Sequence, residues 1–240
     1  MRNIMTKLSG IAVLLAFALP ASVAWGQSGI GGTAHDFTSF GGSGLCTFCH
    51  TPHVAMTQEL LWNHTLSSNS FDWTNPTTTA GTDYPAFAGD TYQGATAKCL
   101  SCHDGSVAIG DIGLGDPGSL GSTFLAGSAV VGGGGNMDGN HPVAMPFPFM
   151  NQGSTYNGAT TGSGIELAEW QPDPTLIGIR LFTDDGAGNV TAGPTPGQTG
   201  MECSSCHDPH NGVDVEDSPF LRGAAGGNGD NYICVKCHDK

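Results

Sequence analysis

The side chains best suited to chemistry in this chain are its cysteines and histidines, and they recur at one spacing. Four segments read Cys-x-x-Cys-His, and together they contain all eight cysteines. Two cysteines three positions apart can form thioethers with the two vinyl groups of one porphyrin, and the histidine that follows can bind its iron. This spacing is typical of a c-type haem attachment site. The sequence therefore predicts four covalently bound haem c groups.

Each motif is expected to supply two thioether cysteines and one proximal iron ligand. The predicted thioether residues are Cys46, Cys49, Cys99, Cys102, Cys203, Cys206, Cys234 and Cys237. The predicted proximal ligands are His50, His103, His207 and His238.

Two other uses of Cys-x-x-Cys pairs compete with haem attachment. The pairs at 203–206 and 234–237 could together make a four-thiolate zinc site. Histidine accounts for only 9 of 240 residues and yet follows every pair, which a zinc site does not require. A thioredoxin-type redox pair would need a βαβ context, which the sequence does not indicate. Haem attachment is therefore the favoured interpretation.

Five further histidines are available as distal ligands for four irons. They are His35, His53, His64, His141 and His210. We expect most of them to bind iron, with one of the five surplus. Methionine ligation would raise the reduction potential, but the histidine supply makes it unnecessary.

Two of these histidines, His53 and His210, lie three residues after a proximal histidine, in His-x-Pro-His sequences. A residue so close to the proximal ligand cannot reach the opposite face of the same haem, because the porphyrin blocks the path. Each is therefore predicted to bind a neighbouring haem. For His53, or with less support His35, that neighbour is predicted to lie in another copy of the chain. A head-to-tail contact of this kind that does not close produces a filament.

The N-terminus predicts export. Residues 1–24 read as a secretory signal peptide, with cleavage after residue 24 or 26. Arg2 and Lys7 precede an apolar run over residues 11–19, which is too short to span a bilayer comfortably. We expect an extracellular or cell-surface protein, with the periplasm as the alternative location, and no membrane span.

The chain is strongly acidic, which limits its partners. It has 7 Lys and Arg against 21 Asp and Glu, for a formal net charge of −14. Because Arg2 and Lys7 lie in the predicted signal peptide, the mature chain keeps 5 basic and 21 acidic residues, a net charge of −16. This argues against nucleic acid and anionic membrane surfaces. It suits cationic partners, metal ions or mineral surfaces, although solubility alone would also account for it.

Composition predicts an irregular fold. Glycine supplies 38 residues and proline 14, and 38% of the chain is hydrophobic, which makes a thin core for this length. We predict an irregular, loop-rich multihaem cytochrome with short helices at the motifs, one β-hairpin over 177–191 and a core formed by stacked haems. Residues 25–240 are predicted to be one tetrahaem unit. It consists of a haem pair at 46–103, a glycine-rich middle segment at 104–200 and a haem pair at 203–238. The glycines indicate either a flexible linker or backbone packed on haem faces.

Several segments together resemble the multihaem c-type cytochromes. These are C-T-F-C-H-T-P-H at 46–53, L-W-N-H-T at 61–65, C-L-S-C-H-D-G-S-V-A at 99–108, N-H-P-V at 140–143, C-S-S-C-H-D-P-H at 203–210 and C-V-K-C-H at 234–238. Haem number, length and signal peptide are similar to those of the tetrahaem cytochromes that polymerise into extracellular filaments in metal-reducing bacteria. The resemblance implies that His35, His64 and His141 are distal ligands. It also implies bis-histidine irons of low potential, stacked and T-shaped haem pairs, and electron transfer to extracellular acceptors.

Three functions compete at the level of sequence. The leading one is an electron conduit that self-associates into a filament and passes electrons between redox proteins and extracellular acceptors such as metal oxides. The second is a monomeric periplasmic or secreted electron shuttle. The third, a multihaem reductase, needs an open coordination position at one haem, and the supply of histidines argues against it. We therefore predict an electron carrier and not an enzyme.

Overall fold

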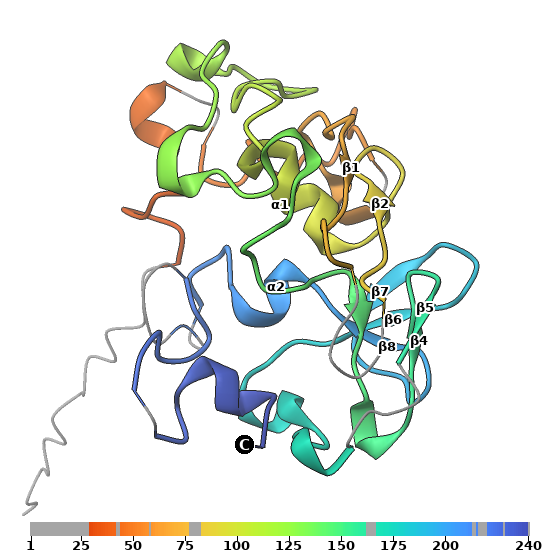
Figure 1. Ribbon diagram of the computed structural model, residues 1–240. Coiled ribbons are helices and arrows are strands. Elements are labelled where there is room, and N and C mark those ends of the chain that lie inside the picture. Colours follow the sequence, from red (N-terminus) through yellow and green to blue (C-terminus); the bar gives the residue numbers. More distant parts are fainter. Residues whose placement is uncertain are drawn as a thin grey trace, which may run out of the picture.

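The computed structural model describes residues 29–41, 44–57, 59–76, 83–161, 167–212, 215, 220–227 and 229–239 (Figure 1). The four Cys-x-x-Cys-His motifs and the five further histidines lie within these ranges. The predicted signal peptide at 1–24 lies outside the described residues. No helix in this part of the chain is both long and apolar enough to cross a bilayer.

Eight short strands form three antiparallel sheets in the described part of the chain. They are β1 (Ser70–Phe71), β2 (Phe87–Ala88), β3 (Met145–Pro146), β4 (Thr155–Tyr156), β5 (Ala159–Thr160), β6 (Phe182–Asp184), β7 (Val190–Ala192) and β8 (Thr199–Met201). One sheet has four strands in the order β3-β8-β6-β7, and the other two are the pairs β1-β2 and β4-β5. Figure 1 shows β4 and β5 beside the four-stranded sheet.

The predicted hairpin is present as β6 and β7. Its turn is built on Asp185, whose carboxylate accepts hydrogen bonds from the amides of Ala187 and Asn189. The first strand begins at Phe182 and not at residue 177, because Pro174–Ile177 forms a 3-10 turn.

Helical turns lie at three of the four motifs. The second motif is in α1 (Ala95–His103), and the third is in α2 (Cys203–Cys206). The fourth overlaps the 3-10 helix η9 (Ile233–Lys236), whereas the first is a succession of turns. The other 3-10 helices in the described ranges are η1 (Thr38–Phe40), η2 (Glu59–Leu61), η3 (Gly118–Leu120), η4 (Gly127–Ala129), η5 (Gly133–Gly135), η6 (Phe149–Asn151), η7 (Leu167–Glu169) and η8 (Pro174–Ile177).

The predicted fold class is wrong. The described residues form a mixed, sheet-rich fold with eight strands and two α-helices, and not an irregular, loop-rich one with a core of stacked haems. Its core consists of three clusters of buried side chains, and the largest contains Phe71, Trp73 and Phe87. Each aromatic side chain buries a large area, so a modest number of them builds a core. The sequence did not indicate these sheets, because strands of two or three residues are too short to show an alternating pattern of apolar and polar residues.

The three core clusters also anchor the motifs. Ala97 and Leu100, on α1, belong to the largest cluster. Cys237 of the fourth motif belongs to the second cluster, with Met145 of β3. Phe48, which lies between the two cysteines of the first motif, belongs to the third. These three motifs are therefore positioned by buried packing, which holds side chains in fixed rotamers.

The glycine run at 132–135 packs against β1. Gly135 has φ 89°, and a side chain there would overlap the carbonyl of Ser70. The Asp72 amide donates a hydrogen bond to the Gly135 carbonyl at 3.0 Å. Glycine permits both the positive φ and the close approach. This part of the glycine-rich segment therefore packs its backbone on a protein strand.

A buried carboxylate joins the second and third motifs. Glu202, which precedes α2, is 1% exposed and accepts hydrogen bonds from the hydroxyls of Tyr92 (2.5 Å) and Tyr156 (2.6 Å). It also accepts from the amide of Thr96 in α1 (2.8 Å), and the Thr96 hydroxyl accepts from the Cys203 amide (3.1 Å). Burial raises the pKa of Glu202, although these hydrogen bonds oppose the rise. The network fixes α1 against α2.

Replacing Glu202 by leucine should lower the free energy of unfolding by about 3–5 kcal/mol, because two phenols and an amide would lose their buried acceptor. Tyr156→Phe removes one donor and leaves the carboxylate its other partners, so a loss of about 1 kcal/mol is expected. Guanidinium unfolding followed by far-UV circular dichroism measures both losses. Equal losses of unfolding free energy in the two variants would contradict the role of Glu202 as the shared acceptor of this network.

Candidate haem sites

One helical turn places the two cysteines and the histidine of a motif on a common side. Residues at i, i+3 and i+4 share a face of a helical turn, and the motif has this spacing. The second motif lies in α1. In the other three motifs the histidine amide donates to the carbonyl of the first cysteine, in the pairs His50–Cys46 (2.8 Å), His207–Cys203 (3.0 Å) and His238–Cys234 (2.9 Å).

Three of the predicted proximal histidines lie close to a predicted distal histidine. The ring centres are 6.2 Å apart in His35–His103, 6.1 Å apart in His50–His210 and 6.4 Å apart in His141–His238. Metal–imidazole bonds are about 2.0–2.1 Å long, and a ring centre lies about 1.1 Å beyond its nitrogen, so two imidazoles across one metal ion have centres about 6.3 Å apart. The separations of these paired histidines fit axial ligation of one iron by each pair.

Backbone carbonyl groups face the Nδ1 atoms of four of the paired histidines. The contacts are His50 with the Leu60 carbonyl (2.7 Å), His103 with Ala129 (2.9 Å), His35 with Pro209 (3.2 Å) and His141 with Pro142 (2.9 Å). A carbonyl only accepts, so the proton is held on Nδ1 and Nε2 keeps the lone pair that binds a metal. Burial also lowers the pKa of His35, which keeps that ring neutral.

The other two candidates, His53 and His64, are placed differently. His64 is 2% exposed, and its Nδ1 and Nε2 face the carbonyls of Thr65 (2.8 Å) and Ala108 (2.9 Å). Its Nε2 also lies 3.4 Å from Sγ of Cys102. The imidazole of His53 lies at the surface, and no hydrogen bond or ring contact with another described residue engages it. The structure therefore brings His35, His141 and His210 to proximal histidines and leaves His53 and His64 apart from them.

Cysteines of successive motifs lie close enough to interact. The interacting thiols are Cys49 with Cys102, Cys99 with Cys203, and Cys206 with Cys237. Burial, followed by the charge of the neighbouring thiol, raises the pKa of Cys102 and of Cys237 to about 12. For Cys99 the hydrogen bond with Cys203 is the largest influence that raises the pKa. The four motifs therefore adjoin one another in the order in which they occur along the chain.

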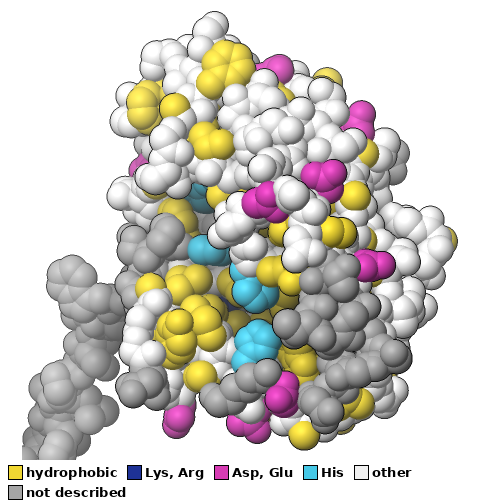
Figure 2. Space-filling view, viewed as in Figure 1, with side chains coloured by type: hydrophobic (Ala, Val, Ile, Leu, Met, Phe, Trp, Pro, Cys, Tyr) yellow, Lys and Arg dark blue, Asp and Glu magenta, His cyan; other side chains and the backbone are white. Residues whose placement is uncertain are grey.

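Several of the histidines lie in a hollow on one face of the molecule (Figure 2). Figure 2 shows several histidine side chains in a row on one face, with hydrophobic side chains beside them. Three basic residues are withdrawn from the surface, since Lys98, Arg222 and Lys236 are 3%, 0% and 4% exposed. Burial of these cations leaves the carboxylates to set the sign of the surface potential, which is negative.

Sequence reasoning did not identify several groups that contact the paired histidines. These contacts are Trp170 with His238 (ring centres 4.5 Å apart), Phe220 with His35 (4.6 Å, stacked) and the Asp208 carboxylate with His210 Nδ1 (3.6 Å). The position of Asp208 within His-Asp-Pro-His is a sequence signal that could have been used. The backbone carbonyls at Nδ1 carry no such signal, because every residue has one.

The residues fit a haem better than a bare metal ion. Among the described residues, no three His, Cys, Asp or Glu side chains converge as a metal-ion site. A haem iron has a different requirement, since the porphyrin supplies the equatorial nitrogens and the protein supplies one or two axial ligands. The paired histidines would hold the iron, and the cysteines of each motif would hold the porphyrin.

A scan against protein-family models finds no match for this chain, and no curated protein is significantly similar to it in sequence. The assignment of the sites therefore rests on the motifs and on the geometry of the paired histidines.

Proposed function

We propose that this protein is a tetrahaem c-type cytochrome that passes electrons between redox proteins and extracellular acceptors such as metal oxides. The observation that supports this function is the separation of the paired histidines, 6.1–6.4 Å, with four of their Nδ1 atoms facing backbone carbonyls. When bound, each haem accepts and donates one electron. Two histidine ligands favour a lower reduction potential than histidine with methionine.

Ligation on both faces of the iron favours a carrier over an enzyme. A multihaem reductase binds its substrate at an open iron position. At the three paired sites His35, His141 or His210 would occupy this position. These imidazoles are fixed by backbone or carboxylate contacts, so they compete with any incoming substrate.

The order of the motifs supports a continuous route for electrons. Cysteines of the first and second, second and third, and third and fourth motifs interact with one another. Porphyrins attached to adjoining cysteines would be near neighbours, and short distances between them favour electron exchange. The route would run from the first motif to the fourth.

The surface around His53 supports self-association of the chain. Val54, Met56 and Leu60 are 69%, 48% and 55% exposed, and Val54 and Leu60 have positive φ values of 57° and 55°. Exposed apolar groups beside an unengaged imidazole are typical of an interface. The proposed partner is a second copy, because His53 lies three residues after His50 and cannot reach the opposite face of the haem that His50 would bind. Repetition of this head-to-tail contact produces a filament.

His141→Ala should leave the iron between His141 and His238 with one axial histidine. After a haem assay has established four covalent haems per chain, electron paramagnetic resonance should show that one of the four has become high-spin. His64→Gln should keep all four haems low-spin, because the ring nitrogens of His64 face carbonyls, at a cost of about 1–3 kcal/mol in stability. A high-spin haem in the His64 variant would make His64 a ligand and refute this assignment.

His53→Ala should abolish filaments while the chain still binds four haems, because the linking ligand is lost. Negative-stain microscopy of secreted protein and size-exclusion chromatography measure assembly, with His64→Gln as the control that should assemble normally. Filaments formed by the His53 variant would exclude His53 as the link. Particles of monomer size in the unmodified protein would favour the soluble shuttle, in the periplasm or secreted.

A further inference from the structure

Two motifs extend to His-x-Pro-His, and the residue at x differs between them. It is Thr51 in the first motif and Asp208 in the third. The imidazole of His53, which ends the first extension, has no hydrogen bond or ring contact with another described residue, whereas His210 pairs with His50 at 6.1 Å. A hydroxyl at x thus accompanies the unengaged imidazole, and a carboxylate accompanies the paired one.

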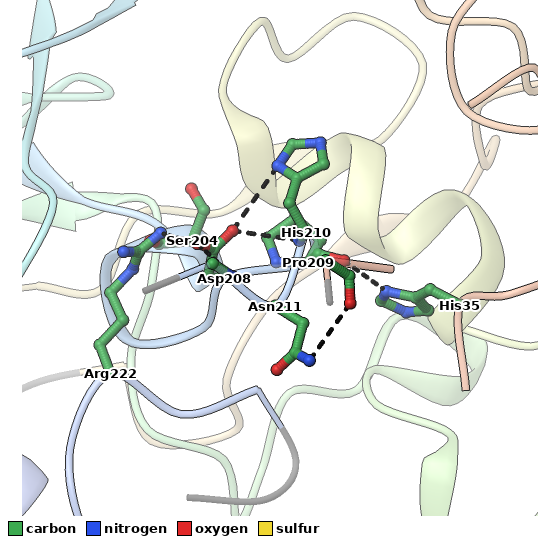
Figure 3. Close-up of polar contacts among 9 residues, drawn as sticks. His35, Ser204, Asp208, Pro209, His210, Asn211 and Arg222 are labelled. Carbon is green, nitrogen blue, oxygen red and sulfur yellow. Dashed lines mark hydrogen bonds and ion pairs between the residues drawn. The ribbon is translucent and has the colours of Figure 1, made fainter. Parts of the chain in front are cut away.

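The Asp208 carboxylate is held from several sides (Figure 3). Its Oδ1 accepts a hydrogen bond from the His210 amide (3.0 Å), and its Oδ2 accepts one from the Gly212 amide (3.3 Å). The guanidinium of Arg222, which is fully buried, lies 3.5 Å from Oδ2. The anionic group therefore has one fixed orientation.

The same carboxylate faces the imidazole of His210. Its Oδ1 lies 3.6 Å from Nδ1, which is beyond a direct hydrogen bond, so the interaction is electrostatic. Negative charge at Nδ1 holds the ring proton there and leaves the lone pair on Nε2. A carboxylate partner also makes an imidazole a stronger donor to a metal. His50, on the other side of this site, has a neutral carbonyl at its Nδ1.

We propose that Asp208 is a positioning residue that lowers the reduction potential of the haem held between His50 and His210, an inference that rests on the function proposed above. A stronger ligand beside a negative charge stabilises the oxidised iron, which carries the greater positive charge. The His210 side chain is 56% exposed, so solvent weakens the effect. We expect about a tenfold change in the equilibrium constant for reducing this haem, which is about 59 mV for one electron.

Potentiometric titration of the full tetrahaem protein, followed by absorption and electron paramagnetic resonance, tests the proposal. Asp208→Asn removes the negative charge but keeps one side-chain oxygen that can accept a hydrogen bond from a backbone amide. It should therefore raise one of the four reduction potentials by about 59 mV and leave the haem content unchanged. Asp185→Asn removes the same charge from the exposed turn between β6 and β7 and should move none of them. His210→Ala identifies the shifted haem, because it abolishes the low-spin signal of the same site.

A second substitution keeps the test decisive if Asp208→Asn fails to bind haem. Asp208→Thr copies the first motif, in which the Thr51 hydroxyl accepts the His53 amide at 3.3 Å. The proposal would be overturned if an Asp208 variant that binds four haems had four unchanged reduction potentials. It would also be overturned if the Asp208 and Asp185 variants shifted the potentials equally. Loss of the first haem from both Asp208 variants would overturn it as well, since the role would then be structural. A wild-type chain without covalent haem would instead overturn the proposed function.

Discussion

A histidine can bind a metal through Nε2 only while its ring proton stays on Nδ1, and in this chain the peptide backbone enforces that condition. The carbonyls of Leu60, Ala129, Pro142 and Pro209 face the Nδ1 atoms of four paired histidines. Because a carbonyl cannot donate, it selects one tautomer without adding charge to the site. Every element that fixes the path of the chain near these four carbonyls therefore contributes to the sites.

The three core clusters help to fix the path of the chain, because each of them anchors a different motif. Phe48 packs in the third cluster, Leu100 in the largest and Cys237 in the second, so buried packing positions the first, second and fourth motifs. The third motif is positioned by polar contacts, since Glu202 and Thr96 bind α2 to α1. The sheets stabilise this arrangement from outside the sites. β3, for example, brings Met145 into the cluster that contains Cys237.

The residues of the candidate sites could be identified from spacing, but their pairing and the fold could not. The eight cysteines and nine histidines are identified by short motifs and by counting. The contact of His35 with the Pro209 carbonyl joins positions 174 apart and uses a group that every residue has. The fold prediction failed for a related reason. Strands such as β1 and β2 have two residues each. The core beside them is built from aromatic residues such as Phe71 and Phe87, which show no periodic pattern in the sequence.

The tetrapeptide His207–His210 explains why sites so far apart along the chain would not act separately. His207 belongs to the third motif, the Pro209 carbonyl orients His35 opposite His103, and His210 lies opposite His50 (Figure 3). Three sites therefore share one short segment. Proline restricts the backbone at its centre, and the Asp208 carboxylate binds the amide two residues on, so the segment has little freedom to adjust one site alone. A displacement that weakened the His210 contact would also move the carbonyl that orients His35. Rigidity at this segment would thus help three neighbouring candidate sites to keep their histidines in place at once.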